Sequence, residues 1–230
     1  MNKLIKFTVF IVLFTGFAVC SFGDSFYNLT GGFYRLYEVY PKEDYGRDME
    51  GANFTISLNY YPETFPIGWF IRTSFGGSYN GFEWEGKKME PMNIYSSSDI
   101  QISAGPSYKL QLGSIVHVPL SLGPVFTNTR EETETYMPYT SGQEYPEYSY
   151  STGFFSAMSF GLLADVSILV NPFNWLTIIN GINMSWDFLR WERGYMQGNL
   201  RNVTNGQFAF QNYHAFKIGF YFGVGLHFGQ

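Results

Sequence analysis

Three histidines, His117, His214 and His227, are the side chains of this sequence best suited to acid–base chemistry near neutral pH. A hydrolase or acyltransferase would place one of them beside a serine and a carboxylate, so that the imidazole can accept the hydroxyl proton. None of the three has a spacing that ties it to such a pair. The sequence also contains no phosphate-binding glycine loop, Cys/His metal set or nucleotide fingerprint. We therefore expect no cofactor, and we rank an enzymatic function below the other functional hypotheses.

A second chemically capable group consists of charged side chains that stand among small residues. Its members are Arg72, Lys109, Asp165, Asp187 and Lys217, with Arg35 as a further candidate. Turned into a narrow lumen, such charges either line a path for ions or pair into a network that plugs it. We predict the plug, because the interior of a small barrel is only wide enough for its own side chains.

Three prolines occupy segments that otherwise have the pattern of strands: Pro106, Pro119 and Pro124. Proline has no N–H to donate to a neighbouring strand. The sequence therefore predicts a bulge or a gap in the hydrogen-bond ladder at this place. Such a gap is either a harmless kink near a strand end or a lateral opening.

The segment 128–152 combines acidic residues with closely spaced tyrosines, including Tyr136, Tyr139, Glu144, Tyr145, Tyr148 and Tyr150. Tyrosine offers rigid, amphipathic contact area, which is typical of recognition surfaces. One hypothesis is a loop that binds a host or cell-surface ligand. The alternative is a solvated loop that has no partner.

The elements that would position these side chains follow from a period of two in hydrophobicity, the spacing of one face of a strand. A weak example lies within 28–40, where Tyr34 and Leu36 share the face opposite Phe33, Arg35 and Tyr37. Seven clearer segments show the alternation: 52–60, 67–76, 100–109, 116–126, 158–168, 176–188 and 216–228. The sequence thus predicts an all-β protein of about eight strands.

The composition of the two strand faces predicts which face meets lipid. In a soluble β protein the face opposite the apolar stripe is rich in Lys and Glu, whereas here it is mostly Gly, Ser, Thr and Asn. The apolar stripes between Ala52 and Phe228 contain no Asp, Glu, Lys or Arg. A charge near the bilayer midplane of a barrel costs about 2–4 kcal/mol. We therefore expect the apolar face outside, in lipid, and a closed barrel, since an open edge leaves backbone groups unpaired.

Short and long connections alternate along the chain, as expected for an up-and-down antiparallel barrel. The short ones are 62–66, 110–113 and 170–174, and the long ones are 41–51, 79–99, 128–152 and 190–207. A soluble all-β fold is the alternative. Aromatic residues are expected in two girdles at the membrane interfaces: Tyr60, Trp69, Tyr108, Trp175 and Phe228 at the short-turn end, and Tyr40, Phe75, Phe126, Trp186 and Phe188 at the other.

The first 23 residues have the pattern of a cleaved signal peptide: two lysines, an apolar run over 7–19 and small residues before Asp24. The apolar run is shorter than the roughly 20 residues of a spanning helix. Cys20, the single cysteine, would be lipidated only if the leader were a lipoprotein signal. The formal net charge is −5, and it becomes −7 without Lys3 and Lys6, which argues against nucleic acid as a partner.

The pattern resembles the small eight-stranded bacterial outer-membrane barrels of the OmpA transmembrane domain, OmpX and OmpW type. Its most specific part is the last segment, 215–228, which is similar to the C-terminal signal that the barrel-assembly machinery reads in that family. The resemblance implies a signal peptide over 1–23 and an integral outer-membrane barrel over 24–230 that contacts outer-membrane lipids. The expected role is structural, adhesive or ligand-displaying. The alternative is sideways passage of small hydrophobic molecules, as in the OmpW-like subset, and a lipid-modifying enzyme is third.

Overall fold

The computed structural model describes residues 23–40, 45–63, 65–80, 92–139, 147–197 and 208–229. Nearly all of them lie in strands. The strands are β1 (Gly23–Tyr40), β2 (Tyr45–Pro62), β3 (Ile67–Tyr79), β4 (Met92–Leu112), β5 (Val116–Tyr139), β6 (Glu147–Phe173), β7 (Leu176–Gln197), β8 (Ala209–Gln211) and β9 (His214–Phe228). The leader expected over 1–23, with Cys20, lies outside the described residues except for Gly23. No helix in the described ranges is long and apolar enough to cross a membrane.

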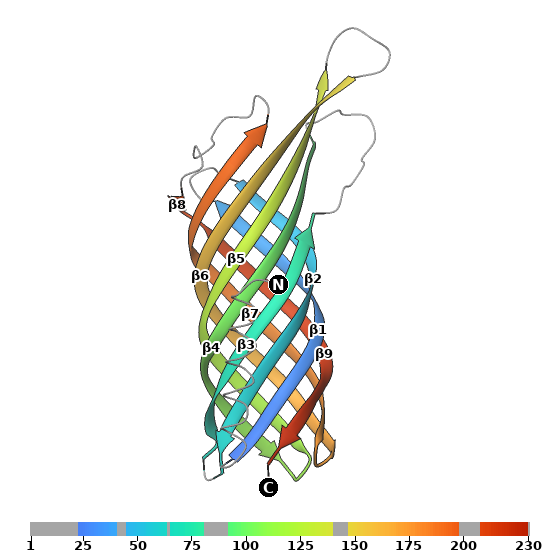
Figure 1. The fold of residues 1–230 in the computed structure, drawn as a ribbon, viewed down its shortest axis with the longest axis vertical. Helices are drawn as coiled ribbons and strands as arrows, with labels where there is room; N and C mark the ends of the chain where they lie inside the picture. The colour runs from blue at the N-terminus through green and yellow to red at the C-terminus, as the bar shows by residue number, and fades with distance from the viewer. Residues whose placement is uncertain are drawn as a thin grey trace, which may run out of the picture.

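Eight long strands form one closed antiparallel ring, in which each strand pairs with its neighbours in the chain (Figure 1). β6 pairs with β7, β7 with β9, and β9 with β1, so the sheet has no free edge over most of its height. The short β8 pairs with β7 above β9 and continues the eighth strand. The ring is the up-and-down barrel that the alternation predicted.

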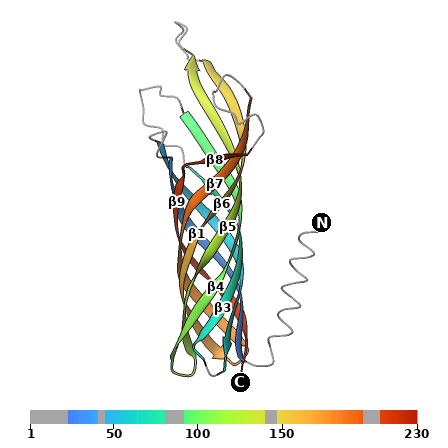
Figure 2. The ribbon, with the colours of Figure 1, turned by 90° about the vertical axis from the view of Figure 1, so that its left-hand side faces the viewer.

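The two ends of the barrel differ in their connections (Figures 1 and 2). Short turns join β2 to β3, β4 to β5 and β6 to β7 at the end that also holds the chain end at Phe228, and we call this the turn end. In the turn after β4, Gly113 has a φ of 81°, a left-handed conformation that favours glycine. The opposite end is called the loop end.

The stagger of the strands sets the width of the barrel. Following paired residues once around the ring from Asn28 leads back to β1 at Glu38, ten residues further along. The path runs through Ser57, Arg72, Ser103, Val125, Gly161, Asp187 and Ala215. Closure with such a stagger requires the strands to tilt by about 35–45°, and eight strands enclose a space that side chains fill.

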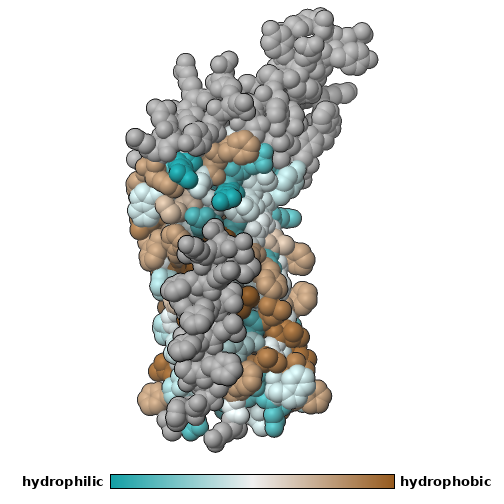
Figure 3. Space-filling view, in the orientation of Figure 1, coloured by the Kyte–Doolittle hydropathy of each residue, from teal (hydrophilic) through white to brown (hydrophobic). Residues whose placement is uncertain are grey.

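The side chains alternate as predicted, apolar outward and mostly polar inward. On β6, Leu162, Val166 and Ile168 are each about half exposed, whereas Asp165 and Ser167 between them are buried. Apolar side chains therefore cover much of the wall (Figure 3). Only a hydrocarbon environment makes so large an apolar exterior stable, and the closed ladder satisfies the backbone groups there.

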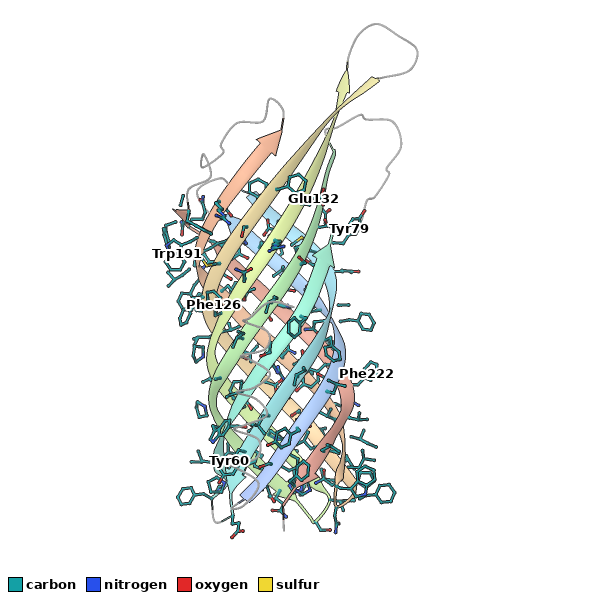
Figure 4. The ribbon with its side chains drawn as sticks, in the orientation of Figure 1. Tyr60, Tyr79, Phe126, Glu132, Trp191 and Phe222 are labelled. Atoms are coloured by element: carbon teal, nitrogen blue, oxygen red, sulfur yellow. The ribbon has the colours of Figure 1, made fainter. Side chains whose placement is uncertain are left out.

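Aromatic rings gather near both ends of the wall, as the girdles predicted. Figure 4 places Tyr60 at the turn end and Tyr79 and Trp191 towards the loop end. At the turn end, the Tyr60 ring lies 5.7 Å from that of Trp69, and Phe173 stacks on Trp175 at 6.0 Å. Towards the loop end, the ring of Trp186 contacts those of Phe188 and Phe216 at 5.3 and 5.9 Å.

The long connections were predicted too long, because the strands continue past the apolar stripes. β2 already begins at Tyr45, β4 at Met92, and β7 ends at Gln197. The largest difference is in 128–152, expected as a loop. There β5 runs to Tyr139 and β6 starts at Glu147, which leaves a paired hairpin beyond the ring. The alternation of hydrophobicity ends where lipid ends, but ladder pairing does not depend on lipid.

The orientation of the wall predicts a depth-dependent cost for charge. Val166 lies in the fully paired part of the ring and is 49% exposed on its outer face. Val166→Arg should lower the free energy of unfolding by about 2–4 kcal/mol, measured by urea denaturation in phospholipid vesicles. The matched change Ser98→Arg, on the exposed face of β4 nearer the loop end, should cost only about 0–1 kcal/mol. Equal costs at the two positions would contradict a lipid-facing wall.

Candidate functional site: the lumen and the loop-end hairpin

The middle of the lumen holds a buried ion pair that spans the barrel. Arg72 of β3 donates to Asp165 of β6 through Nη2 at 2.9 Å, with both side chains under 10% exposed. Tyr221 of β9 donates its hydroxyl to the two oxygens of the same carboxylate at 2.8 and 3.0 Å. Its ring also lies under the guanidinium, 5.0 Å from Arg72 Cζ. Three strands from different sides are thus joined at one carboxylate.

A second network fills the lumen towards the loop end and centres on Arg190 of β7. Its guanidinium donates to Glu131 at 2.5 Å, to Glu192 at 2.9 Å and to Glu38 at 3.3 Å. Tyr213 donates its hydroxyl to Glu38 at 2.6 Å, and its ring lies 4.6 Å from Arg190 Cζ. One cation surrounded by three carboxylates makes this end of the lumen acidic.

Between these two networks, Lys217 of β9 donates to Asp99 of β4 at 3.0 Å and lies 3.6 Å from the ring centre of Tyr34. Asp187 accepts a hydrogen bond from Ser159 at 2.5 Å. The remaining cavity beside these residues has a volume of about 20 Å³, which is room for roughly one water molecule. Little room for water is therefore left in this cavity.

The turn end of the lumen is closed by another ion pair and by stacked rings. Lys109 of β4 forms an ion pair with Asp24 of β1, and Nε2 of His227 lies 3.5 Å from the same carboxylate. The Phe26 ring stacks on His227, with centroids 4.6 Å apart, and lies 5.4 Å from His117. These contacts tie the first residues of β1 to the last residues of β9.

Larger apolar and aromatic side chains also point into the lumen, beside the small polar residues that dominate the inward face. Phe26, Tyr61, Leu169, Ile179 and Tyr221 form one buried cluster. A second, smaller cluster contains Phe70, Val125 and Leu163. The faces opposite the apolar stripes are rich in small polar residues, but these larger side chains fill what the small ones leave open. The barrel is a packed core and not a pore.

The five predicted lumen charges all point inward, although they do not form one network. Arg72, Asp165, Asp187 and Lys217 are buried, and Lys109 is partly exposed. Arg72 and Asp165 pair with each other and with Tyr221, whereas Lys109 pairs with Asp24 and Lys217 pairs with Asp99. The separate network of Arg190 with Glu38, Glu131 and Tyr213 was not predicted for the lumen. Asp99, Glu131 and Arg190 lay in segments expected to be loops. No alternation of charged with small residues marks them in the sequence: Asp99 follows three serines, Glu131 lies between Arg130 and Glu132, and Arg190 lies between Leu189 and Trp191.

Arg35 was wrongly assigned to the lumen. Its side chain is 65% exposed on the outer wall, where Nε and Nη2 form a forked pair with Asp48 of β2. Tyr34 and Leu36 take the inward face instead, and Phe33 and Tyr37 are exposed beside Arg35. The reason is the register of β1 in the sheet. Side chains alternate along the strand, and this register turns Phe33, Arg35 and Tyr37 to the lipid side.

The prolines interrupt the ladder without shifting its register. Pairing between β4 and β5 stops after Ser103–Val125 and resumes at Ser107–Ser121, which skips Pro106 and Pro124. Pairing between β5 and β6 likewise skips Pro119, whose side chain is fully buried. The predicted gap is present, as an interruption and not as a bulge. The strands still approach closely, because a Cβ added to Gly123 would lie 3.1 Å from Gly105 Cα.

Four of the six predicted recognition residues fall on the paired strands of the β5–β6 hairpin. Tyr136 and Tyr150 are register partners, and Tyr148 pairs with Pro138. Tyr139, the last residue of β5, pairs with Glu147. Glu144 and Tyr145 lie outside the described residues. The hairpin extends beyond the rest of the ring at the loop end (Figures 1 and 2).

Among the described residues, His214 is not held as a general base would be. His214 stacks its ring on Trp186 at 6.0 Å, and its Nδ1 has no hydrogen-bond partner in the described part of the chain. A general base needs such a partner to fix its tautomer. No group of three or more His, Cys, Asp or Glu within the described ranges is placed to hold a metal ion.

Comparisons with known proteins reach the fold only. No protein-family model matches the chain, and no curated protein matches it in sequence. Its fold is similar to that of Ail, the attachment invasion locus protein of Yersinia pestis, at 13% identity and a TM-score of 0.41, covering 90% of this chain and 99% of Ail. A major outer membrane protein of Thermus thermophilus is 12% identical in sequence, with a TM-score of 0.41. The match covers 87% of this chain and 99% of that protein. Neisserial surface protein A is 12% identical in sequence, with a TM-score of 0.39, and the match covers 87% of this chain and 96% of that protein. Nothing about ligand or activity follows from these values.

The buried pair in the middle of the lumen gives a direct test of the plug. Arg72→Met removes the cation and leaves Asp165 buried and charged, so the free energy of unfolding should fall by about 3–5 kcal/mol. Arg72→Met combined with Asp165→Leu should recover most of this loss, because no uncompensated charge remains. Urea unfolding of the two variants in the same vesicles measures both values. Additive losses in the double variant would show that the two residues do not interact.

Proposed function

We propose that this chain is an integral protein of a bacterial outer membrane that displays its loop end outside the cell, and that its role is structural or adhesive. The observation that carries the proposal is the combination of a filled lumen with a paired hairpin, formed by β5 and β6, that extends past the ring. A barrel whose interior is packed offers its exposed end as the functional surface.

The packing of the lumen supports display over conduction. The lumen contains the ion pairs of Lys109 with Asp24, Arg72 with Asp165, Lys217 with Asp99 and Arg190 with its three glutamates, and buried apolar clusters fill space beside them. Porins that hold an aqueous channel use about 16–18 strands. Moving charge through this interior would require separation of buried pairs, each costing several kcal/mol.

The hairpin supports a contact surface. It carries four of the six predicted recognition residues on two paired strands, so that its backbone is held by a ladder and not left as a free loop. A preformed element loses less conformational entropy on binding than a free loop does. Tyrosine-rich, acidic surface of this kind suits contact with a protein or glycan on another cell.

A conductance measurement distinguishes a display protein from a protein that conducts ions. The purified barrel, inserted into a planar bilayer in 1 M KCl (about sevenfold physiological ionic strength), should show no discrete conductance steps, because buried ion pairs and apolar side chains occupy the lumen. An Arg190→Ala variant, which removes the cation that holds three carboxylates, should show at most brief flicker. Stable ohmic steps from the wild-type protein would overturn the plug.

Replacing 137–149 with a short Gly-Ser linker tests the hairpin. The variant should keep the heat-dependent gel mobility of a closed barrel, since these residues lie beyond the ring. Cells that display the wild type should bind a glycan array or an extracellular-matrix panel, and cells with the shortened hairpin should not. A matched deletion of 82–90, between β3 and β4, controls for loss of loop length. Unchanged binding by the shortened hairpin would remove the proposed contact surface.

The ladder interruption supports one alternative, passage of a small hydrophobic molecule sideways through the wall. The cluster of Phe70, Val125 and Leu163 lies in the lumen beside Pro124, so that an apolar surface stands behind the interrupted pairs. If this is the function, wild-type protein should speed uptake of an apolar dye into proteoliposomes, and Pro119→Ala, which restores an N–H, should slow it. A display protein should change the uptake rate in neither case.

A further inference from the structure

A groove lies on the outer wall of the barrel, towards the loop end. It has a volume of 370 Å³ and is crossed by outward residues of several strands, including Leu122, Leu162, Ala164, Met184, Trp186 and Phe216. This volume is within the range of small-ligand sites, which are about 300–1,000 Å³ and mostly apolar. The groove is lined mainly by lipid-facing side chains and does not include the hairpin, and the buried residues Ser185 and Lys217 also border it.

The shape of the groove follows from one small side chain and a wall of rings. Ala164 stands in the outward stripe of β6 between Leu162 and Val166, so the floor is low at this position. On one side, the Trp186 and Phe216 rings stack in parallel, with centroids 5.9 Å apart and an interplanar angle of 1°. Such a trough fits an unbranched hydrocarbon chain.

The groove also includes the charged pair of Arg35 and Asp48. These side chains are 65% and 43% exposed, and the forked contact between them uses Nε and Nη2 of the guanidinium. Nη1 of Arg35 takes no part in this contact. Glu50, the register partner of Arg35 on β2, is exposed on the same face. The polar end of the groove thus presents one cation beside two carboxylates.

This charge pattern selects among lipid headgroups. A purely anionic headgroup would meet Arg35 but would be repelled by Asp48 and Glu50. A headgroup with a phosphate and a primary amine satisfies both signs: phosphate oxygens accept from Nη1 of Arg35, and the ammonium donates to the carboxylates. Near the membrane interface, exposed charges on a barrel cost only about 0–1 kcal/mol, so the pair is tolerated there.

We propose that this groove is a binding site for one phospholipid with a phosphate-and-amine headgroup. An acyl chain lies over Ala164 beside the stacked rings, and the headgroup binds Arg35, Asp48 and Glu50. The site is independent of the display role, because it does not use the hairpin.

The test uses the purified full-length barrel and native mass spectrometry, with phosphatidylethanolamine, phosphatidylglycerol and phosphatidylcholine as probes of equal chain length. One phosphatidylethanolamine should be retained in preference to the other two. Arg35→Gln should weaken retention about tenfold, as expected for loss of a charge-assisted hydrogen bond. Ala164→Phe, which fills the floor, should weaken all three lipids. Ala104→Phe, on the exposed wall of β4 outside the groove, should weaken none.

Each variant is first checked for heat-dependent gel mobility, so that loss of binding is not loss of the barrel. Equal retention by wild type and Ala164→Phe would overturn the groove as a site. Preference for phosphatidylglycerol, or retention unaffected by Arg35→Gln, would overturn the headgroup assignment. Should a variant fail to close, Asp48→Asn and Met184→Phe test the headgroup and the groove with smaller changes.

Discussion

Pairing of the backbone is the constraint on which the other features depend. In hydrocarbon an unpaired N–H or C=O costs several kcal/mol, so strands can cross a bilayer only as a closed ring. Closure with eight strands and a stagger of ten residues fixes a narrow lumen. The narrow lumen in turn requires that inward charges find partners within it, because water has little room there.

Polar and apolar residues are distributed in the opposite way to those of a soluble protein. Polar and charged residues form the packed centre, where Arg72, Asp165 and Tyr221 join three strands, while the apolar residues form the surface. The conspicuous charged pair on the outer wall in the described residues, Arg35 with Asp48, marks the polar end of a groove. The proposed contact surface is therefore the part that extends past the ring, since side chains fill the centre.

Much of the fold could be predicted from the sequence, and the candidate site only in part. The alternation over 158–168 or 216–228 gives strand type, face and orientation toward lipid, because period two is a local property of the chain. The inward direction of Lys217 and Asp165 follows from the same parity. Arg35 was misplaced because β1 carries mixed residues on both faces, so that local alternation did not distinguish its two sides. The hairpin was taken for a loop because its residues are polar on both faces.

The sequence by itself determined the two faces, the short turns and the absence of charge from the apolar stripes. Only the tertiary structure decided which charges meet: Arg190 contacts Glu38, 152 residues away, and Lys217 contacts Asp99, 118 residues away. Such pairings depend on the stagger of the closed ring, which no single strand encodes. The apolar face of a strand follows from every second residue of that strand alone. The partner of a charged residue across the lumen depends on how all eight strands are aligned in the ring.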